Sequence, residues 1–281
     1  MIYISTGHYR ELNAREILTL FEKNKIKNIE FSGGKYSTKL KNLFLKNSDK
    51  FKFQIHNYFP PPKKPIVINL SSQNKKVLND SLKLIKKAID LTKLFNGQFY
   101  SFHAGFLVDL LPKDLGKSKS KFREINFDVG LSTFLKNIEI ISRYAQKRNV
   151  EILLENNVIG SYNFKRFKKN PFLMADPKSI EYIMKNTSNN VNLLLDVGHL
   201  KVSAKTLGFD KNRAHEKVKK WIKAYHISEN NGNEDTNSLI NNKSWFLKKL
   251  KSVRSYTLEV YNSDIDLIKK QVKILNKSLH G

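Results

Sequence analysis

The chain has 281 residues, 40% of them hydrophobic and 27% charged, which is the composition of a soluble globular protein and a usual length for one α/β barrel. It contains no cysteine, which excludes disulfides, thiolate catalysis and cysteine-ligated zinc. The net charge of +26 first suggests a nucleic-acid partner, but most of the excess is lysine spread along the whole chain. The joint bias toward Lys, Asn and Ile is typical of an AT-rich genome, so the charge is either compositional or serves an anionic ligand such as a phosphorylated sugar, a nucleotide sugar or DNA.

No apolar run approaches the roughly 20 residues that a membrane span requires. The first ten residues, MIYISTGHYR, lack a basic region followed by an apolar stretch, which argues against a signal peptide. Together with the absence of cysteine, these features predict a cytoplasmic protein.

Short apolar runs alternate with helical periodicity along the whole chain. The runs predict eight β-strands, at Ile2–Ser5, Asn28–Phe31, Phe51–His56, Phe99–His103, Glu151–Glu155, Asn192–Asp196, Ala224–Ile227 and Tyr256–Glu259. Such nearly continuous hydrophobicity is expected of parallel strands that are covered on both faces. The amphipathic stretches predict helices at Ala14–Asn24, Val77–Phe95, Phe127–Arg148, Pro177–Lys185, Lys211–Lys223, Ser244–Leu250 and Ser263–Leu279, with starts at Asp176-Pro177 and Ser263.

Eight strands that alternate with helices indicate either a closed barrel or a doubly wound sheet. The barrel is favoured because most of the strands end in a polar residue, whereas a doubly wound sheet concentrates its site at one switch point. Neither a G-x-G-x-x-G motif nor a P-loop is present in the sequence. The sequence therefore predicts a single (β/α)8 TIM barrel over residues 1–281.

Six of the predicted strands end in an acid or an imidazole. These residues are His56, His103, Glu155, Asp196, His226 and Glu259. A barrel of parallel strands brings its C-terminal ends together at one mouth, so we expect the six side chains to share one cavity. Carboxylates and imidazoles together suit a divalent ion such as Zn²⁺ or Mn²⁺.

Each candidate also has an ordinary structural interpretation. Glu155 and Glu259 end apolar strands and need a partner, which is either a bound cation or a neighbouring lysine. Asp196 and His199 form a D-x-x-H pair in which Gly198 permits a tight turn that folds the histidine back to the mouth. The alternative is an aspartate that caps a helix beside an unrelated histidine.

The remaining candidates lie on three further segments. Strand alternation places His226 on the face opposite Tyr225 and Ile227, and the loop after it offers Asp235 and Asn237 near the site. Taken alone, His56 and His103 could equally be satisfied core histidines. The other histidines are expected outside the site, His8 in a loop and His215 and His280 on helix surfaces.

Three long connections follow strands, at Tyr58–Gln73, Ala104–Asn126 and Asn156–Ala175. Long loops on the catalytic face of a barrel usually shape the pocket, although solvated surface excursions are the alternative. The last two are predicted to wall the pocket. Lys165, Arg166 and Lys168 are the candidates for binding a phosphate or carboxylate of the substrate.

The order of these residues, H…H…E…DxxH…H…DxN…E, resembles the xylose-isomerase-like TIM-barrel superfamily over most of the chain. The segments FHAGF, ILLENN, LLDVGH and HISENNG each resemble strand ends of its sugar phosphate isomerase/epimerase proteins, and endonuclease IV is a more distant relative. The resemblance implies that Glu155, Asp196, His226 and Glu259 bind one divalent ion, with Mn²⁺ or Zn²⁺ preferred and Mg²⁺ or Co²⁺ compatible. It also places His199 at the site.

The resemblance implies a metal-dependent isomerase or epimerase of carbohydrate metabolism that acts on a sugar or sugar derivative through an enediolate. Glu155 and Glu259 would take and return the proton, and His199 would join them as a catalytic residue. His56, His103, Asp235 and Asn237 are candidates for a further metal or for substrate contacts.

Two other functions remain open at this point. The same histidines and the basic charge also fit an endonuclease IV-like enzyme that cleaves abasic DNA. However, Asp235-Thr236-Asn237 departs from the D-x-H of that nuclease, which puts a three-metal cluster in doubt. A non-catalytic binding barrel is disfavoured because all four metal-ligand candidates are retained. The sequence does not identify the sugar, the choice between isomerisation and epimerisation, the number of ions or the oligomeric state, although barrels of this superfamily often pair.

Overall fold

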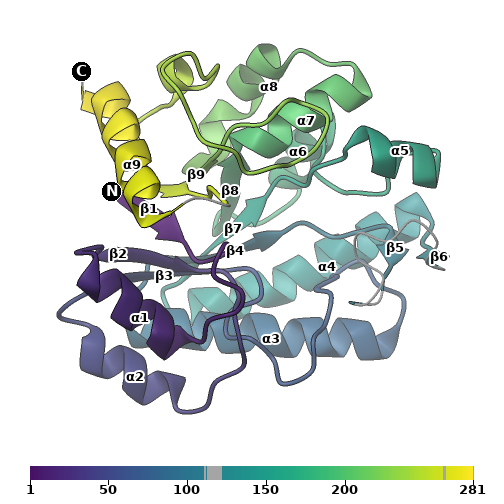
Figure 1. The fold of residues 1–281 in the computed structure, drawn as a ribbon. Helices are drawn as coiled ribbons and strands as arrows, with labels where there is room; N and C mark the ends of the chain where they lie inside the picture. Colours follow the sequence, from purple (N-terminus) through teal and green to yellow (C-terminus); the bar gives the residue numbers. More distant parts are fainter. Residues whose placement is uncertain (111, 113–121, 262–263, 281) are drawn as a thin grey trace.

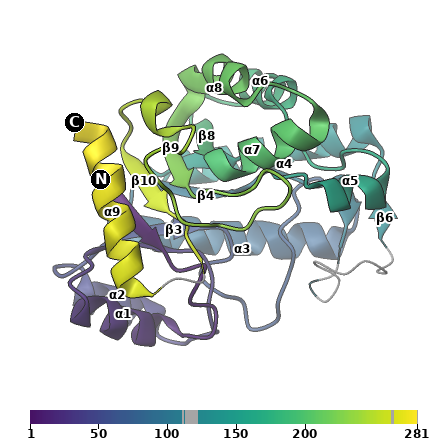
Figure 2. The same cartoon turned by 45° about the horizontal axis from the view of Figure 1, so that its top comes forward.

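The structure is a computed structural model that describes residues 1–110, 112, 122–261 and 264–280. Eight parallel strands close into a barrel in the spatial order β1-β10-β9-β8-β7-β4-β3-β2, and the helices lie around it (Figures 1 and 2). The barrel strands are β1 Ile2–Ser5, β2 Asn28–Phe31, β3 Lys52–His56, β4 Phe99–His103, β7 Glu151–Glu155, β8 Val191–Asp196, β9 Ile222–Ile227 and β10 Ser255–Leu258. The predicted (β/α)8 TIM-barrel fold is confirmed, and every predicted strand is present within one or two residues.

The strands alternate between a face that packs against the helices and a face that fills the barrel. Large residues on the outward face, such as Phe31 on β2 and Tyr100 on β4, are fully buried in the main core. A separate small apolar cluster joins Phe99, Leu153 and Leu194 to Ala224. Each of these residues lies an even number of positions before the polar residue at its strand end, so both point into the barrel. The barrel interior is therefore apolar toward the N-terminal ends of the strands and polar at the C-terminal mouth.

Six of the predicted helices are present, with modest changes at their ends. They are α1 Ala14–Lys23, α3 Lys75–Leu94, α4 Phe127–Gln146, α6 Pro177–Lys185, α8 Lys211–Val218 and α9 Ile265–His280. The predicted start of the last helix, Ser263, lies outside the described residues. Asn13 and Asp176 cap α1 and α6 by accepting hydrogen bonds from backbone N–H groups of the first turn.

One predicted helix is absent and another is shorter than predicted. The stretch Ser244–Leu250 forms only one 3₁₀ turn, Leu247–Lys249, and the stretch Lys211–Lys223 is helical to Val218 and continues as a 3₁₀ turn and a strand. Three helices were not predicted. These are α2 Leu40–Asn47, α5 Ser161–Phe167 and α7 Val197–Leu207.

The two long connections after β4 and β7 pack against each other. A short hairpin, β5 Val108–Asp109 with β6 Arg123–Glu124, lies in the first connection, and α5 lies in the second. The Leu107 N–H donates to the Pro171 carbonyl at 2.7 Å, and the Leu173 N–H donates to the Gly105 carbonyl at 3.1 Å. Backbone hydrogen bonds therefore tie the described parts of these connections together beside the C-terminal ends of β4 and β7.

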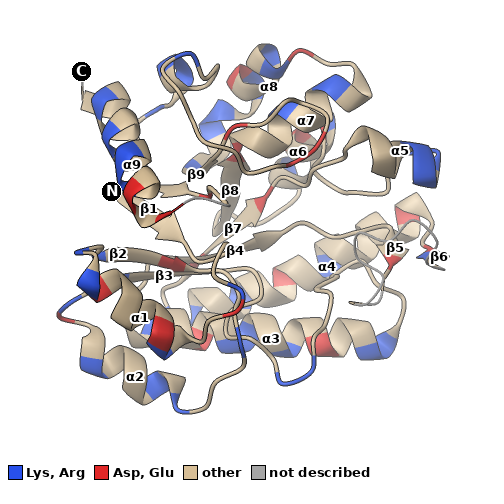
Figure 3. Ribbon diagram, in the orientation of Figure 1, with Lys and Arg blue, Asp and Glu red and all other residues tan. Residues whose placement is uncertain are grey.

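Lysine and arginine residues are spread over the outer helices, as the blue segments in Figure 3 show for α2, α3, α5, α8 and α9. This distribution agrees with the scatter of lysine along the sequence. Among the described residues, no helix has both the length and the apolar character needed to cross a membrane.

Candidate active site

The C-terminal ends of six strands bring the predicted acids and imidazoles together inside the barrel. Four of them form one group, in which one ligand atom from each of Glu155, Asp196, His226 and Glu259 lies within 4.8 Å of the others. These four side chains come from the ends of β7, β8, β9 and β10, and all are buried, with Glu259 the most accessible at 8%. Residues separated by up to 104 positions in sequence, from 155 to 259, thus share one cavity.

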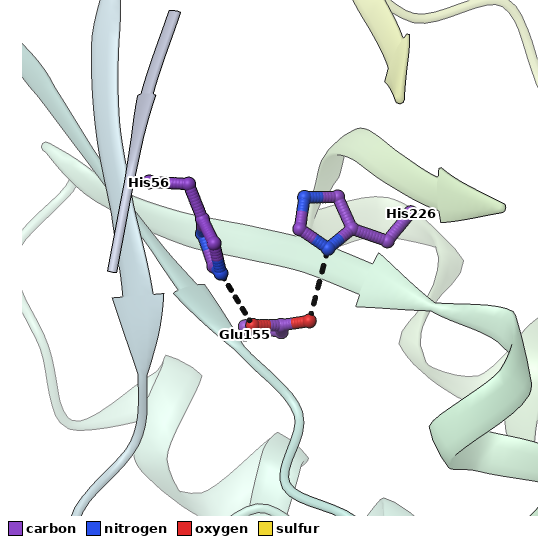
Figure 4. Close-up of side chains that lie close together, drawn as sticks. All are labelled: His56, Glu155 and His226. Atoms are coloured by element: carbon purple, nitrogen blue, oxygen red, sulfur yellow. Dashed lines mark hydrogen bonds and ion pairs between the residues drawn. The ribbon is translucent and has the colours of Figure 1, made fainter. Parts of the chain in front are cut away.

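The Glu155 carboxylate lies at the centre of this group, between the imidazoles of His56 and His226 (Figure 4). Its Oε1 is 3.1 Å from His226 Nδ1, and its Oε2 is 3.3 Å from His56 Nε2 and 3.2 Å from His103 Nδ1. Burial alone would raise the pKa of Glu155, but the neighbouring histidines hold it well below its usual range. Glu155 is therefore an ionised carboxylate in a fully buried position.

Three carboxylates converge on one nitrogen of His226. Its Nδ1 is 2.9 Å from Glu259 Oε2 and 3.9 Å from Asp196 Oδ2, in addition to the 3.1 Å contact with Glu155. Burial by itself lowers the pKa of His226, yet the surrounding glutamates raise it well above the ordinary value. Three buried carboxylates this close together carry negative charge that a bound divalent cation would neutralise.

Asp196 both caps a helix and faces the site. Helix α7 begins directly after β8, and the Asp196 carboxylate accepts a hydrogen bond from the His199 N–H at 2.7 Å. The expected tight turn at Gly198 was wrong, because Gly198 is helical. A Cβ at this position would lie 2.7 Å from Ser228 Oγ, so a larger residue would displace that hydroxyl. Burial raises the pKa of Asp196 to about 7, with Asp235 and Glu155 adding to the effect against the opposing charge of His199.

His199 connects the central group to the loop after β9. Its Nδ1 is 2.9 Å from the Asn156 carbonyl oxygen, and its Nε2 is 3.1 Å from Asp235 Oδ2. With its amide turned so that the nitrogen faces Asp235, Asn237 donates to both Asp235 oxygens, at 2.8 and 3.0 Å. In this orientation Asn237 holds Asp235 in place through its NH₂ group, which is a donor and not a metal ligand.

His56 and His103 line the other side of Glu155. The Ser101 hydroxyl is 3.0 Å from His56 Nδ1, which leaves His56 Nε2 facing Glu155. Ligand atoms of His56, Glu155 and His226, and separately of His103, Glu155 and His199, also lie close enough together to hold an ion. Burial lowers the pKa of His103 to about 4, so this imidazole is neutral near pH 7 and available as a ligand.

The three residues predicted to bind an anionic substrate, Lys165, Arg166 and Lys168, lie in α5 or at its C-cap. Lys165 and Lys168 are exposed, while the Arg166 guanidinium lies over the rings of Phe122 and Phe167 at 5.5 and 5.0 Å. Their role in substrate binding stays a prediction.

One histidine was placed wrongly from the sequence. His215 is fully buried between α8 and the barrel, where its Nε2 is 3.0 Å from the Tyr225 hydroxyl, so it is not a helix-surface residue. Tyr225 and His226 do point to opposite faces of β9, as strand alternation predicts.

Two residues of the site were not identified from the sequence. Glu30, in the middle of β2, is fully buried and lies 3.0 Å from His226 Nε2. The Tyr261 hydroxyl donates to Glu259 Oε1 at 2.8 Å. The available signals were a lone acid within the apolar run NIEF and the two-residue spacing of Glu259 and Tyr261 after β10.

The sequence model of the xylose isomerase-like TIM barrel matches residues 18–258, which is most of the chain. The chain belongs to the xylose isomerase-like TIM-barrel family. No curated protein matches it by sequence. The resemblance inferred from the strand ends is therefore confirmed at the level of the family.

Solved structures of similar fold include several sugar epimerases. A D-tagatose 3-epimerase-like protein is 19% identical with a TM-score of 0.74, covering 99% of this chain and 96% of that one. The D-psicose 3-epimerase of Clostridium cellulolyticum, solved with D-tagatose, is 11% identical with a TM-score of 0.68 over 99% and 98% of the two chains. A Thermus thermophilus protein whose crystal was soaked with zinc chloride is 15% identical with a TM-score of 0.63 over 98% of each chain. At these identities the likeness shows the shared fold.

Proposed function

We propose that this protein is a metal-dependent isomerase or epimerase of a sugar or sugar derivative. The observation that carries the proposal is the buried group of Glu155, Asp196, His226 and Glu259 at the barrel mouth. The sugar epimerases among its structural neighbours support a carbohydrate substrate and this class of reaction.

The donor set fits a divalent cation. It offers three carboxylates and one imidazole nitrogen, a combination that suits Mn²⁺ or Zn²⁺. Glu155 Oε2 is buried without an aligned hydrogen bond, which a cation or a proton donor would have to satisfy. When bound, such an ion would polarise a substrate carbonyl and favour loss of the proton on the adjacent carbon.

The two glutamates are placed to move that proton. Glu155 and Glu259 reach His226 Nδ1 from different strands, and each keeps a second oxygen that is not directed at this nitrogen. The second oxygen of Glu259, Oε1, accepts a hydrogen bond from the Tyr261 hydroxyl, and this bond orients the Glu259 carboxylate. One glutamate would take the proton from the carbon beside the carbonyl, and the other would return it to the enediolate from the opposite face or to the neighbouring carbon.

Metal content tests the proposal. Elemental analysis of protein prepared without chelator should find one divalent ion per chain, and the chelated protein should lose activity and regain it with Mn²⁺ or Zn²⁺. Two or three zinc ions per chain would instead favour nuclease-type chemistry. A protein that binds no divalent ion, although correctly folded, would contradict the proposal.

The endonuclease IV-like alternative is not favoured. Its support is the second set of imidazoles, His56, His103 and His199, around Glu155 and Asp235. Asn237 donates its amide to Asp235 where that nuclease would need a further imidazole ligand. Two of the three structural neighbours described above are named for sugar epimerases, and none of the three is named for a nuclease. We propose that His56 and His103 contact the substrate or hold a second ion at the same mouth.

Zinc affinity should rise as the pH increases through about 7. Metal ligands must be unprotonated, and burial raises the pKa of Asp196 to about 7, while the glutamates raise that of His226. Below that pH the folded protein holds protons that the ion must displace, so affinity falls and binding releases protons. Calorimetric titration in buffers of different ionisation enthalpy measures this release, and an affinity that is constant on both sides of pH 7 would show the expectation to be wrong.

Lys165, Arg166 and Lys168 should contribute to substrate affinity if the substrate is anionic. Reversing all three charges should raise KM for a phosphorylated or acidic sugar and leave kcat nearly unchanged, because these groups would bind the anionic part of the substrate and are not proposed to transfer protons. The comparison requires an identified anionic substrate. An unchanged KM would remove this role from the three residues.

A further inference from the structure

A buried glutamate lies beneath the proposed metal site. Glu30 projects from β2 into the barrel and is fully buried. Three donor groups surround its carboxylate. They are Gln54 Nε2 at 2.5 Å, Thr257 Oγ1 at 3.0 Å and His226 Nε2 at 3.0 Å. An ionised carboxylate only accepts hydrogen bonds, so it matches this set of donors.

Ser255 fixes the orientation of the Gln54 amide. Ser255 Oγ donates to Gln54 Oε1 at 3.1 Å, which turns the Gln54 NH₂ toward Glu30. Glu30 Oε2 therefore accepts hydrogen bonds from both Gln54 and Thr257, whereas Oε1 faces His226 Nε2. Glu30 Oε1 and His226 Nε2 are both fully enclosed and lack an aligned hydrogen bond, so each depends on the other for a partner.

His226 thus lies between two sets of carboxylates that use different ring nitrogens. Nδ1 faces Glu155, Glu259 and Asp196, whereas Nε2 faces Glu30. A neutral histidine can bind a metal only through the nitrogen that carries no proton. The acceptor at the second nitrogen decides which tautomer is present.

We propose that Glu30 is a positioning residue that holds the proton of His226 on Nε2 and thereby commits Nδ1 to the metal. This inference rests on the proposed metal-dependent function and extends it to the support of one ligand. Glu30 itself does not touch the substrate, because it lies below His226 within the barrel.

The substitution Glu30→Gln separates this role from simple packing. Glutamine has nearly the same shape, but one of its two terminal groups is an NH₂. If that NH₂ faces Gln54, two donors oppose each other. If it faces His226, the imidazole must accept through Nε2 and carry its proton on Nδ1, which blocks the metal. Loss of such a supporting partner typically weakens metal affinity by about 10–100-fold.

Zinc affinity and histidine NMR test the proposal on the same samples. We expect Glu30→Gln to bind zinc about 10–100-fold more weakly than the wild type, in competition with a chromophoric chelator. The matched control is Glu151→Gln, at the opposite end of the barrel, where Glu151 pairs with Asn192 and Arg254. The control should retain wild-type zinc affinity even if its melting temperature falls.

NMR of ¹⁵N-histidine-labelled wild type provides a test that needs no variant. The zinc-loaded protein should show the His226 proton on Nε2 and the metal on Nδ1. Coordination through Nε2, or wild-type affinity in a folded Glu30→Gln protein, would overturn the inference and leave the metal site intact. Failure of the wild type to bind zinc would overturn the proposed function and this inference with it.

Discussion

Glu155→Gln and Glu259→Gln should each lower kcat by about 10²–10⁴, because each removes a positioned acid or base. Both side chains are buried and approach the same imidazole nitrogen from different strands. Burial would raise the pKa of Glu259, but His226 lowers it to about 2, so the group is ionised near pH 7. The amide is nearly isosteric with the carboxylate but cannot accept a proton. The measurement is kcat with a sugar substrate under saturating metal.

Saturating metal is required because both glutamates are also proposed ligands. Metal affinity measured on the same variants separates a lost ligand from a lost acid or base. Glu151→Gln again serves as the control, since Glu151 lies at the start of β7 and Glu155 at its end. If either site variant, loaded with metal, turned over within a factor of about ten of the wild type, that glutamate would not be an acid or base of the reaction.

Phe44→Ala should reduce the free energy of unfolding by about 3–5 kcal/mol, the usual cost of truncating a buried phenylalanine. Phe44 is fully buried and is the only buried residue of α2. Its ring centroid is 4.8 Å from that of Phe53, 5.1 Å from Phe31, 5.7 Å from Phe95 and 5.8 Å from Phe59. The cavity would open beside β2 and β3, the strands that carry Glu30 and His56.

Denaturant unfolding of the metal-free protein measures this effect without a contribution from metal binding. Phe44→Leu is the matched control, because it keeps most of the buried volume and should be less destabilising than Phe44→Ala. A loss below about 1 kcal/mol for the alanine variant would mean that α2 is not anchored through this ring.

The strand ends could be predicted because two simple regularities act together there. Parallel strands buried on both faces read as short apolar runs, and closure of the barrel brings their C-terminal ends to one mouth. His56 and Glu155 end such runs, His226 lies one residue before the end of its strand, and all three meet in the structure. The family was identified from these same positions.

Glu30 could not be predicted in the same way. It lies in the middle of a four-residue strand, where one acid among apolar neighbours reads equally well as facing solvent or the barrel interior. Its burial depends on Gln54, Thr257 and His226, which come from three other strands. His215 was misplaced for a related reason, since α8 is mostly polar and the imidazole is buried against Tyr225 on β9 and Trp245, which lie outside the helix.

The unpredicted helices are those with weak local signals. α2 has one buried residue and no side-chain cap, so its sequence carries neither a wide apolar face nor a helix-start signal. α7 follows β8 without any loop, and Gly198 within its first turn suggested a bend instead of a helix. Its start nevertheless makes the two interpretations of Asp196 compatible, because a helix that begins at the strand end lets one carboxylate cap α7 and face the proposed metal site.

Solvent deuterium incorporation is the most direct test of proton transfer by the two glutamates. Candidate ketoses and aldoses would be incubated with metal-loaded protein in deuterated water and followed by NMR. The proposed mechanism predicts deuterium at the carbon beside the carbonyl with the wild type, and none with Glu155→Gln or Glu259→Gln. Product formed without deuterium at that carbon, or cleavage of abasic DNA at enzyme-like rates with no exchange into any sugar, would contradict it.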